Sequence, residues 1–261
     1  MTKDKPVKKV EKSARKHGPK SAPTRVPSKG AQRPLQEEVQ AALSWLRRHS
    51  TKRTREGMAR FGIPSDNALG VSVGDIRVLA KRLGRNHELA LALWSTKVYE
   101  ARMLTAFVAE PARVTSAQMD RWCRDFDSWA ICDTLCFHLF DRTSHAFAKV
   151  AQWSEKRAEF EKRAAFALLA SLAGHDKTTG DEPFLKSLRF IGRAATDERN
   201  FVKKGVNWAL RGVGRRNRVL NAAAVKVARR LAASLQPAAR WVGKDALREL
   251  TSPKVMRRFA A

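Results

Sequence analysis

The chain has 261 residues, of which 43% are hydrophobic and 30% are charged, and its 52 Lys and Arg against 25 Asp and Glu give a formal net charge of +27. The apolar fraction suffices for a sizeable core, and the positive charge points to a polyanionic partner, foremost nucleic acid. The longest apolar run, residues 164–174, is about half of the roughly 20 residues that cross a bilayer, which argues against a membrane protein.

The first 33 residues hold 11 bases and two acids, with many Lys, Pro and Ser and almost no large apolar side chains. Such a segment buries too little surface to offset its ordering entropy, so we predict a disordered basic tail over residues 1–33 that attracts phosphates without sequence preference. A solubility tail is the alternative. Residues 34–261 still carry an excess of 18 positive charges and are predicted to form one helical-repeat domain.

From Pro34 onward the apolar residues recur three and four positions apart, which indicates helices. Residues 34–50 follow this pattern, and residues 72–84 open with a capping-box-like pair, Ser72 and Asp75, and stop at Gly84. The further predicted helical segments are 86–96, 99–110, 115–126, 124–140, 155–174, 181–195, 198–217, 221–235 and 238–251.

No segment alternates as a strand does, and the helical segments are separated by Pro, Gly, Asp or Ser. Their spacing suggests antiparallel helix pairs of about 35–40 residues, the size range of HEAT-like repeats. We therefore predict an all-α fold, a curved solenoid of degenerate HEAT-like helix pairs with a concave basic groove. Solenoids bind along that face.

Three clustered cysteines (Cys123, Cys132 and Cys136) are too few for a disulfide framework, which fits a reducing, cytoplasmic compartment. The N-terminus also lacks the apolar core of a signal peptide. Cys132, Cys136 and His138 could be imagined as metal ligands, but structural zinc needs a second ligand pair. Small thiols facing the core, and no metal, are the better interpretation.

The segment "DSWAICDTLCFHLF", residues 127–140, places Trp129 and Asp133 one helical turn apart at the shoulder of an apolar stripe. Ser128 is a candidate N-cap, so both residues lie in the first turns, where helix-end amides favour negative charge. An acid at the shoulder of an apolar stripe, with an indole one turn before it, could form one wall of a cleft.

A second indole, Trp208 in "NFVKKGVNWALRG", straddles the apolar face of its helix and a polar ridge that carries Lys204 and Arg211. An aromatic beside cations suits contact with a sugar or base while the cations hold phosphates. The alternative is an indole that packs one edge against a neighbouring helix.

Arg163 lies in "FEKRAAFALLA", where small and apolar residues surround it. It either points into a groove or pairs with a buried acid such as Asp133 or Asp176. The sequence contains no phosphate-binding glycine loop, zinc-protease helix or nucleophile elbow.

Together these segments resemble the DNA alkylation repair family, the AlkD-like DNA glycosylases built from HEAT-like repeats. The resemblance spans roughly residues 56–251 and is carried by the following stretches: "GVSVGDIRVLAKRLG", "YEARMLTAFV", "DFDSWAICDTLC", "FEKRAAFALLASLAGHDK" and "DERNFVKKGVNWALRGVGRRN".

The resemblance implies that Asp133, Trp129 and Trp208 are catalytic and that Arg163 is the arginine of the groove. The remaining predicted DNA-binding residues are Lys203, Lys204, Arg211 and Arg215. Family members excise positively charged N3- or N7-alkylated purines from duplex DNA. The resemblance implies that the partner is double-stranded DNA with alkylated bases and that no cofactor is needed. We expect a monomer.

Related sequences often have an acid directly after the first Trp, where this chain has Ala130. If that acid supports Asp133, the rate or specificity differs here. Two other functions stay open: a non-catalytic HEAT-like protein that binds damaged or distorted duplex, and a protein-interaction scaffold with an acidic partner or RNA.

Overall fold

A computed structural model describes residues 34–259, so the predicted tail over residues 1–33 lies outside the described residues. All regular elements of the described chain are helical. The α-helices are α1 (Leu35–Arg48), α2 (Lys52–Gly57), α3 (Val73–Leu83), α4 (His87–Ser95), α5 (Tyr99–Val108), α6 (Ser116–Arg124), α7 (Trp129–His138), α8 (Ala146–Ser154), α9 (Glu159–His175), α10 (Glu182–Ala194), α11 (Asn200–Gly214), α12 (Arg218–Ala232), α13 (Pro237–Leu250) and α14 (Pro253–Arg257). Three short 3₁₀ helices cover Met58–Phe61, Pro111–Arg113 and Phe140–Arg142.

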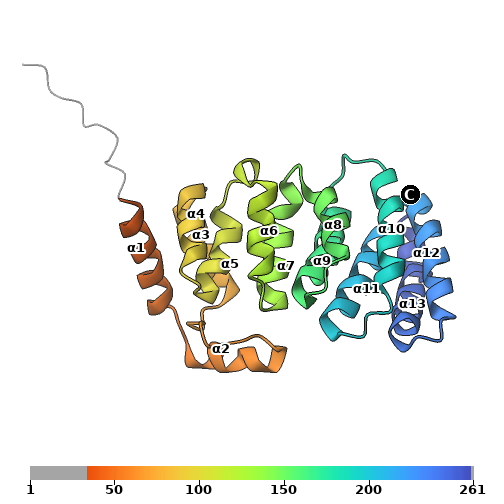
Figure 1. Cartoon of the computed structure of the whole chain (residues 1–261), viewed down its shortest axis with the longest axis horizontal. Coiled ribbons are helices and arrows are strands. Elements are labelled where there is room, and N and C mark those ends of the chain that lie inside the picture. Colours follow the sequence, from red (N-terminus) through yellow and green to blue (C-terminus); the bar gives the residue numbers. More distant parts are fainter. Residues whose placement is uncertain (1–33, 260–261) are drawn as a thin grey trace, which may run out of the picture. The chain divides into compact units, whose positions relative to one another are not determined.

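Apart from α2, the longer helices of the described residues follow one another in a row (Figure 1), and neighbours along the chain pack as pairs, α4 with α5, α8 with α9, α10 with α11 and α12 with α13. The second members of these pairs and α7 also contact one another in order, α5 with α7, α7 with α9, α9 with α11 and α11 with α13. Their side-chain contacts join residues 28–30 positions apart between α7 and α9, and 38 apart between α11 and α13. Residue numbers increase in the same direction along both helices of each contact, so these helices run parallel, as equivalent helices of successive repeats do.

The predicted all-α class with HEAT-like helix pairs is confirmed. The Ser72 side chain caps α3 by accepting from the Asp75 amide at 3.1 Å, and Gly84 ends that helix with a φ of 68°. No helix was predicted at α2, α8 or α14, although Ala146, Val150 and Trp153 of α8 are buried at helical spacing. Among the described residues, no helix is both long and apolar enough to span a membrane.

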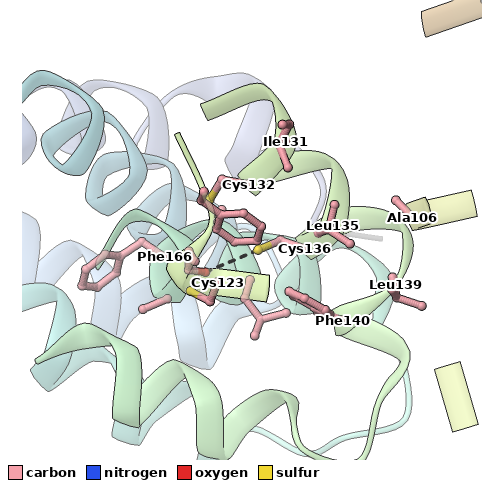
Figure 2. Close-up of a cluster of buried hydrophobic side chains, with 14 of the residues drawn as sticks. Ala106, Cys123, Ile131, Cys132, Leu135, Cys136, Leu139, Phe140 and Phe166 are labelled. Carbon is pink, nitrogen blue, oxygen red and sulfur yellow. Dashed lines mark hydrogen bonds between the residues drawn. The ribbon is translucent and has the colours of Figure 1, made fainter. Parts of the chain in front are cut away.

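The three cysteines are buried, unpaired thiols of the core (Figure 2). The thiol of Cys136 donates to the carbonyl of Ala164 at 3.6 Å and that of Cys132 lies 3.8 Å from the carbonyl of Phe160, so both link α7 to α9. Burial raises the pKa of Cys123 and of Cys136 far above the ordinary thiol range. His138 contacts Arg77 at 3.2 Å from its Nε2 and not the cysteines. These thiols therefore pack the inter-helix contact that positions α7.

The start of α11 is held by Asp197, which accepts from the side chains of Arg199 at 2.6 and 2.9 Å and of Lys162 at 3.3 Å. Arg199 in turn donates to the carbonyl of Arg157 at 2.6 Å. These charge-assisted bonds, chiefly those from Arg199, lower the pKa of Asp197 to about 2. The network fixes the register of α11 against α9.

Asp197→Asn is expected to lower the free energy of unfolding at pH 7 by about 1–2 kcal/mol, since each unit of pKa shift corresponds to about 1.4 kcal/mol and part of the site is solvated. Because the folded-state pKa is depressed, this stabilisation is complete above about pH 4 and disappears as the pH falls toward 2. Urea unfolding of both proteins between pH 2 and 7 measures it. A difference that stays constant across this range would contradict the assignment.

Candidate functional site

Asp133 and Arg163 form a two-pronged ion pair between α7 and α9. The Arg163 Nε donates to Asp133 Oδ1 at 2.9 Å and its Nη2 donates to Oδ2 at 2.7 Å. The third nitrogen, Nη1, donates to the carbonyl of Phe201 at 2.7 Å, at the start of α11. Arg163 therefore pairs with a buried acid, which is Asp133 and not Asp176, and it also lines the pocket described below.

Burial governs the electrostatics of this pair. The side chains of Arg163 and Asp133 are 7% and 16% exposed. Burial raises the pKa of Asp133 above the ordinary carboxyl range, and the charge and hydrogen bonds of Arg163 oppose that rise. Burial works to lower the pKa of Arg163, but the Asp133 carboxylate outweighs it and the pKa is raised. The arginine stays charged and holds the carboxylate oxygens in one orientation.

Trp129 begins α7 and anchors a turn that is remote in sequence. Its Nε1 donates to the carbonyl of Phe61 at 2.8 Å. The turn ends at Gly62 with a φ of 65°, and a Cβ there would lie 3.2 Å from the Phe201 ring, so the position favours glycine. Ser128 does stand at the N-cap position, but its side chain makes no cap bond and its buried Oγ has no partner.

A pocket of about 530 Å³ opens beside Trp129 and Arg163. Its lining residues are Arg60, Phe61, Gly62, Trp129, Arg163, Asn200, Phe201 and Lys204. They come from the 58–62 turn and from α7, α9 and α11. None is acidic, and of the three cations Arg163 is already paired with Asp133. Arg60, Lys204 and the partial positive charge at the N-terminal end of α11 make the pocket favour an anionic group. Asp133, the partner of Arg163, is not itself one of the lining residues.

Trp208 lies outside this pocket, one turn after Lys204 on α11. Its ring stacks on Phe137 of α7, with centroids 4.7 Å apart and planes 9° from parallel. Phe137 follows Asp133 by one turn, so Trp129, Asp133 and Phe137 share one line of α7. The half-buried indole of Trp208 thus packs against the neighbouring helix α7, which was the alternative to a contact with a sugar or base. Trp208 and Lys204 lie on the same side of α11.

The other predicted DNA-binding residues lie apart from the pocket. The Lys203 ammonium stands 5.3 Å from the ring of Trp241. Arg211 and Arg215 both pair with Glu249 of α13, at 2.6 and 3.1 Å. The structure therefore brings Trp129, Arg163 and Lys204 together in one pocket and engages these two arginines in intramolecular ion pairs.

Sequence reasoning missed the 58–62 turn as part of this site. Arg60 and Phe61 lie some 70 positions before Trp129, and Phe61 is an exposed aromatic at 64%. The only sign of this site in the sequence was an aromatic residue, Phe61, between the basic Arg60 and Gly62. Ala130, where relatives often have an acid, is buried at 7% exposure, so an acid there would need a partner inside the protein.

Trp129→Phe is expected to lower the free energy of unfolding by about 1 kcal/mol. Phenylalanine still provides an aromatic ring at this position but has no N–H to donate to the Phe61 carbonyl. Denaturant unfolding measures the loss. The matched control is Trp241→Phe, an indole that is 42% exposed, which should change stability little. Equal losses in the two variants would show that the tie to the turn contributes nothing.

The family model described as "DNA alkylation repair enzyme" matches residues 42–250. The chain belongs to this family. No curated protein sequence matches the chain.

One solved structure similar to this chain is described as "a new family of proteins related to the HEAT-like repeat DNA glycosylases with affinity for branched DNA structures". It is 20% identical, with 81% of this chain and 94% of that chain covered and a TM-score of 0.68, and it supports the HEAT-like fold. Two designed armadillo repeat proteins match at TM-scores of 0.31 and 0.34, with 13% and 11% identity; the alignments cover 68% and 71% of this chain and 92% and 83% of theirs.

Proposed function

We propose that the protein is a DNA glycosylase that excises positively charged N3- or N7-alkylated purines from duplex DNA. The observation that carries the proposal is the Asp133 carboxylate, held by Arg163 next to a pocket that contains an indole and otherwise favours anions. Membership of the DNA alkylation repair family and the net charge of +27 support the same substrate class.

The pocket supplies the groups that would position the substrate. Arg60 and Lys204 would contact backbone phosphates, and the Trp129 indole would lie against the deoxyribose. Phe61, exposed at the rim, adds a second apolar surface. These contacts need no metal or redox cofactor.

Alkylation gives the purine a positive charge, which makes it a good leaving group. When the bond between C1′ and the base nitrogen breaks, its electron pair goes to the base, which leaves neutral, and C1′ acquires oxocarbenium character. The Asp133 carboxylate stabilises this positive charge and orients a water molecule, whose oxygen bonds to C1′ as a proton is lost. The acid thus serves a cation that forms on the DNA.

The test is release of free base from a methylated duplex, with the spontaneous rate measured in parallel. Release of 7-methylguanine or 3-methyladenine above the spontaneous rate supports the proposal. Duplex binding without release would assign Trp129 and Asp133 to a binding scaffold.

A second candidate function is binding of branched or distorted DNA without catalysis. Arg163 already engages both oxygens of Asp133, and the similar solved structure belongs to proteins described as having affinity for branched DNA. A four-way junction and a linear duplex of the same sequences separate the two functions. Preference for the junction, combined with no base release, would favour this candidate.

A further inference from the structure

A second pocket, of about 400 Å³, lies at the other ends of α9 and α11. It is lined by Ala170, Ala173, Gly174, Lys177, Gly212, Arg215, Arg216, Arg258 and Phe259. Four of these nine residues are cations and none is acidic. Arg163 and Gly174 both belong to α9, and the rise of the helix places the two positions roughly 16 Å apart, far enough to contact different phosphates.

Arg216 is a fixed cationic wall of this pocket. Its Nη1 donates to the carbonyls of Leu172, Ala173 and Asp176, which end α9, and its Nη2 donates to Thr179 at 3.2 Å. Its guanidinium carbon lies 3.9 Å from the centroid of the Phe184 ring. These bonds satisfy the free carbonyls at the C-terminus of α9, which accounts for an arginine at this position. All four partners are backbone carbonyls, so no carboxylate neutralises the charge of Arg216.

The other three cations are tied down less than Arg216: Lys177 Nζ makes one bond to the end of α9, to the carbonyl of Gly174 at 2.6 Å. Lys177, Arg216 and Arg258 make no ion pair within residues 34–259, whereas Arg215 pairs with Glu249, a carboxylate that it shares with Arg211; Arg211 also lies 3.9 Å from Asp245. The pocket therefore holds a surplus of positive charge that the protein does not itself balance.

Gly174 gives an independent indication. It lies within α9 at an ordinary helical φ, and a Cβ built on it would meet nothing within 4 Å. Gly212 across the pocket differs, because a Cβ there would touch Ala173 at 3.4 Å and the α9 backbone at 3.5 Å. Gly174 is the exposed, next-to-last residue of α9, so no packing contact requires glycine there, and the space that its missing side chain leaves open belongs to the pocket.

We propose that this pocket binds a backbone phosphate of nucleic acid and anchors the duplex at a second point away from Trp129. The proposal rests on the proposed function in that the ligand is DNA, and it includes Arg215, which was predicted to contact DNA. The small-residue floor admits the phosphate, Phe259 lines the pocket as an apolar wall, and Lys177, Arg215 and Arg258 supply the charge.

The experiment measures binding of an undamaged duplex to the full chain by fluorescence anisotropy at several salt concentrations. The first variant, Gly174→Leu, fills the pocket without changing charge. The second, Lys177→Gln/Arg258→Gln, removes two cations, and its matched control is Lys226→Gln/Arg229→Gln on α12, which removes two exposed cations outside the pocket. Gly174→Ala checks the fold, since it should raise the unfolding midpoint.

Loss of one phosphate contact should weaken binding about fivefold at 0.15 M salt and reduce the slope of log K against log salt by about 0.9. We expect both pocket variants to show this and the control to keep the wild-type slope. Pocket variants that bind as the control does would overturn the proposal. So would stabilisation of the wild type by inorganic phosphate that Gly174→Leu abolishes while duplex binding is unaffected, because the ligand would then be a free phosphate.

The outcomes also separate this proposal from the proposed function. If the wild type releases alkylated base while the pocket variants match the control, only the anchor fails. If the wild type binds no duplex, both fail. If it binds duplex through the pocket and releases no base, the anchor stands and the glycosylase proposal falls.

Discussion

Asp133→Asn is expected to slow release of alkylated base at least tenfold, about 1.4 kcal/mol of barrier, while duplex binding is retained. Asparagine keeps the shape of the side chain but removes the negative charge that would stabilise the oxocarbenium-like transition state. Binding should not weaken, because the change frees the Arg163 guanidinium from its carboxylate. Single-turnover base release, with anisotropy on the same duplex, measures both quantities.

The pH dependence gives a second readout of the same residue. Since burial raises the pKa of Asp133, catalysis by the wild type should decline, as the pH falls, at a higher pH than an exposed carboxyl with a pKa near 3.9 would give. Spontaneous loss of base is subtracted at each pH. An Asn variant as fast as the wild type, with an unchanged pH profile, would remove Asp133 from the chemistry.

Arg163→Met is expected to lower the free energy of unfolding by about 3 kcal/mol, the largest stability effect predicted for this chain. It leaves the Asp133 carboxylate, only 16% exposed, without its two donors. It also removes the bond to the Phe201 carbonyl that ties α9 to α11. Denaturant unfolding measures the loss.

The double variant Asp133→Leu/Arg163→Met separates two causes of destabilisation, the buried carboxylate left without a partner and the loss of packing. Because it removes both charges, it should be more stable than Arg163→Met alone. The loss in Arg163→Met should also shrink as the pH falls. The unpaired Asp133 has a folded-state pKa above its unfolded value, so the folded protein takes up the proton more readily. Equal losses in the single and double variants would contradict this account.

Much of the architecture follows from local pattern. The helical spacing of apolar residues predicts nearly every long helix, and the Ser72 and Gly84 signals identify both ends of α3. The longest of the helices that were not predicted, α8, is still short and has Lys149 on its buried side, where it pairs with Asp120 at 2.6 Å. A buried cation of that kind breaks the apolar pattern, because its partner comes from another helix.

What the sequence by itself determined is the class of the chain: an all-helical domain of repeated pairs, strongly basic, with Trp129 and Asp133 one turn apart. These properties depend on spacing along one helix and on composition, which are local. Tertiary structure alone decided the partners. The choice of Asp133 over Asp176 for Arg163, the stacking of Trp208 on Phe137, and the tie from Trp129 to Phe61 each join segments 30 or more positions apart. Such contacts depend on how successive repeats stack, and no single helix carries that information.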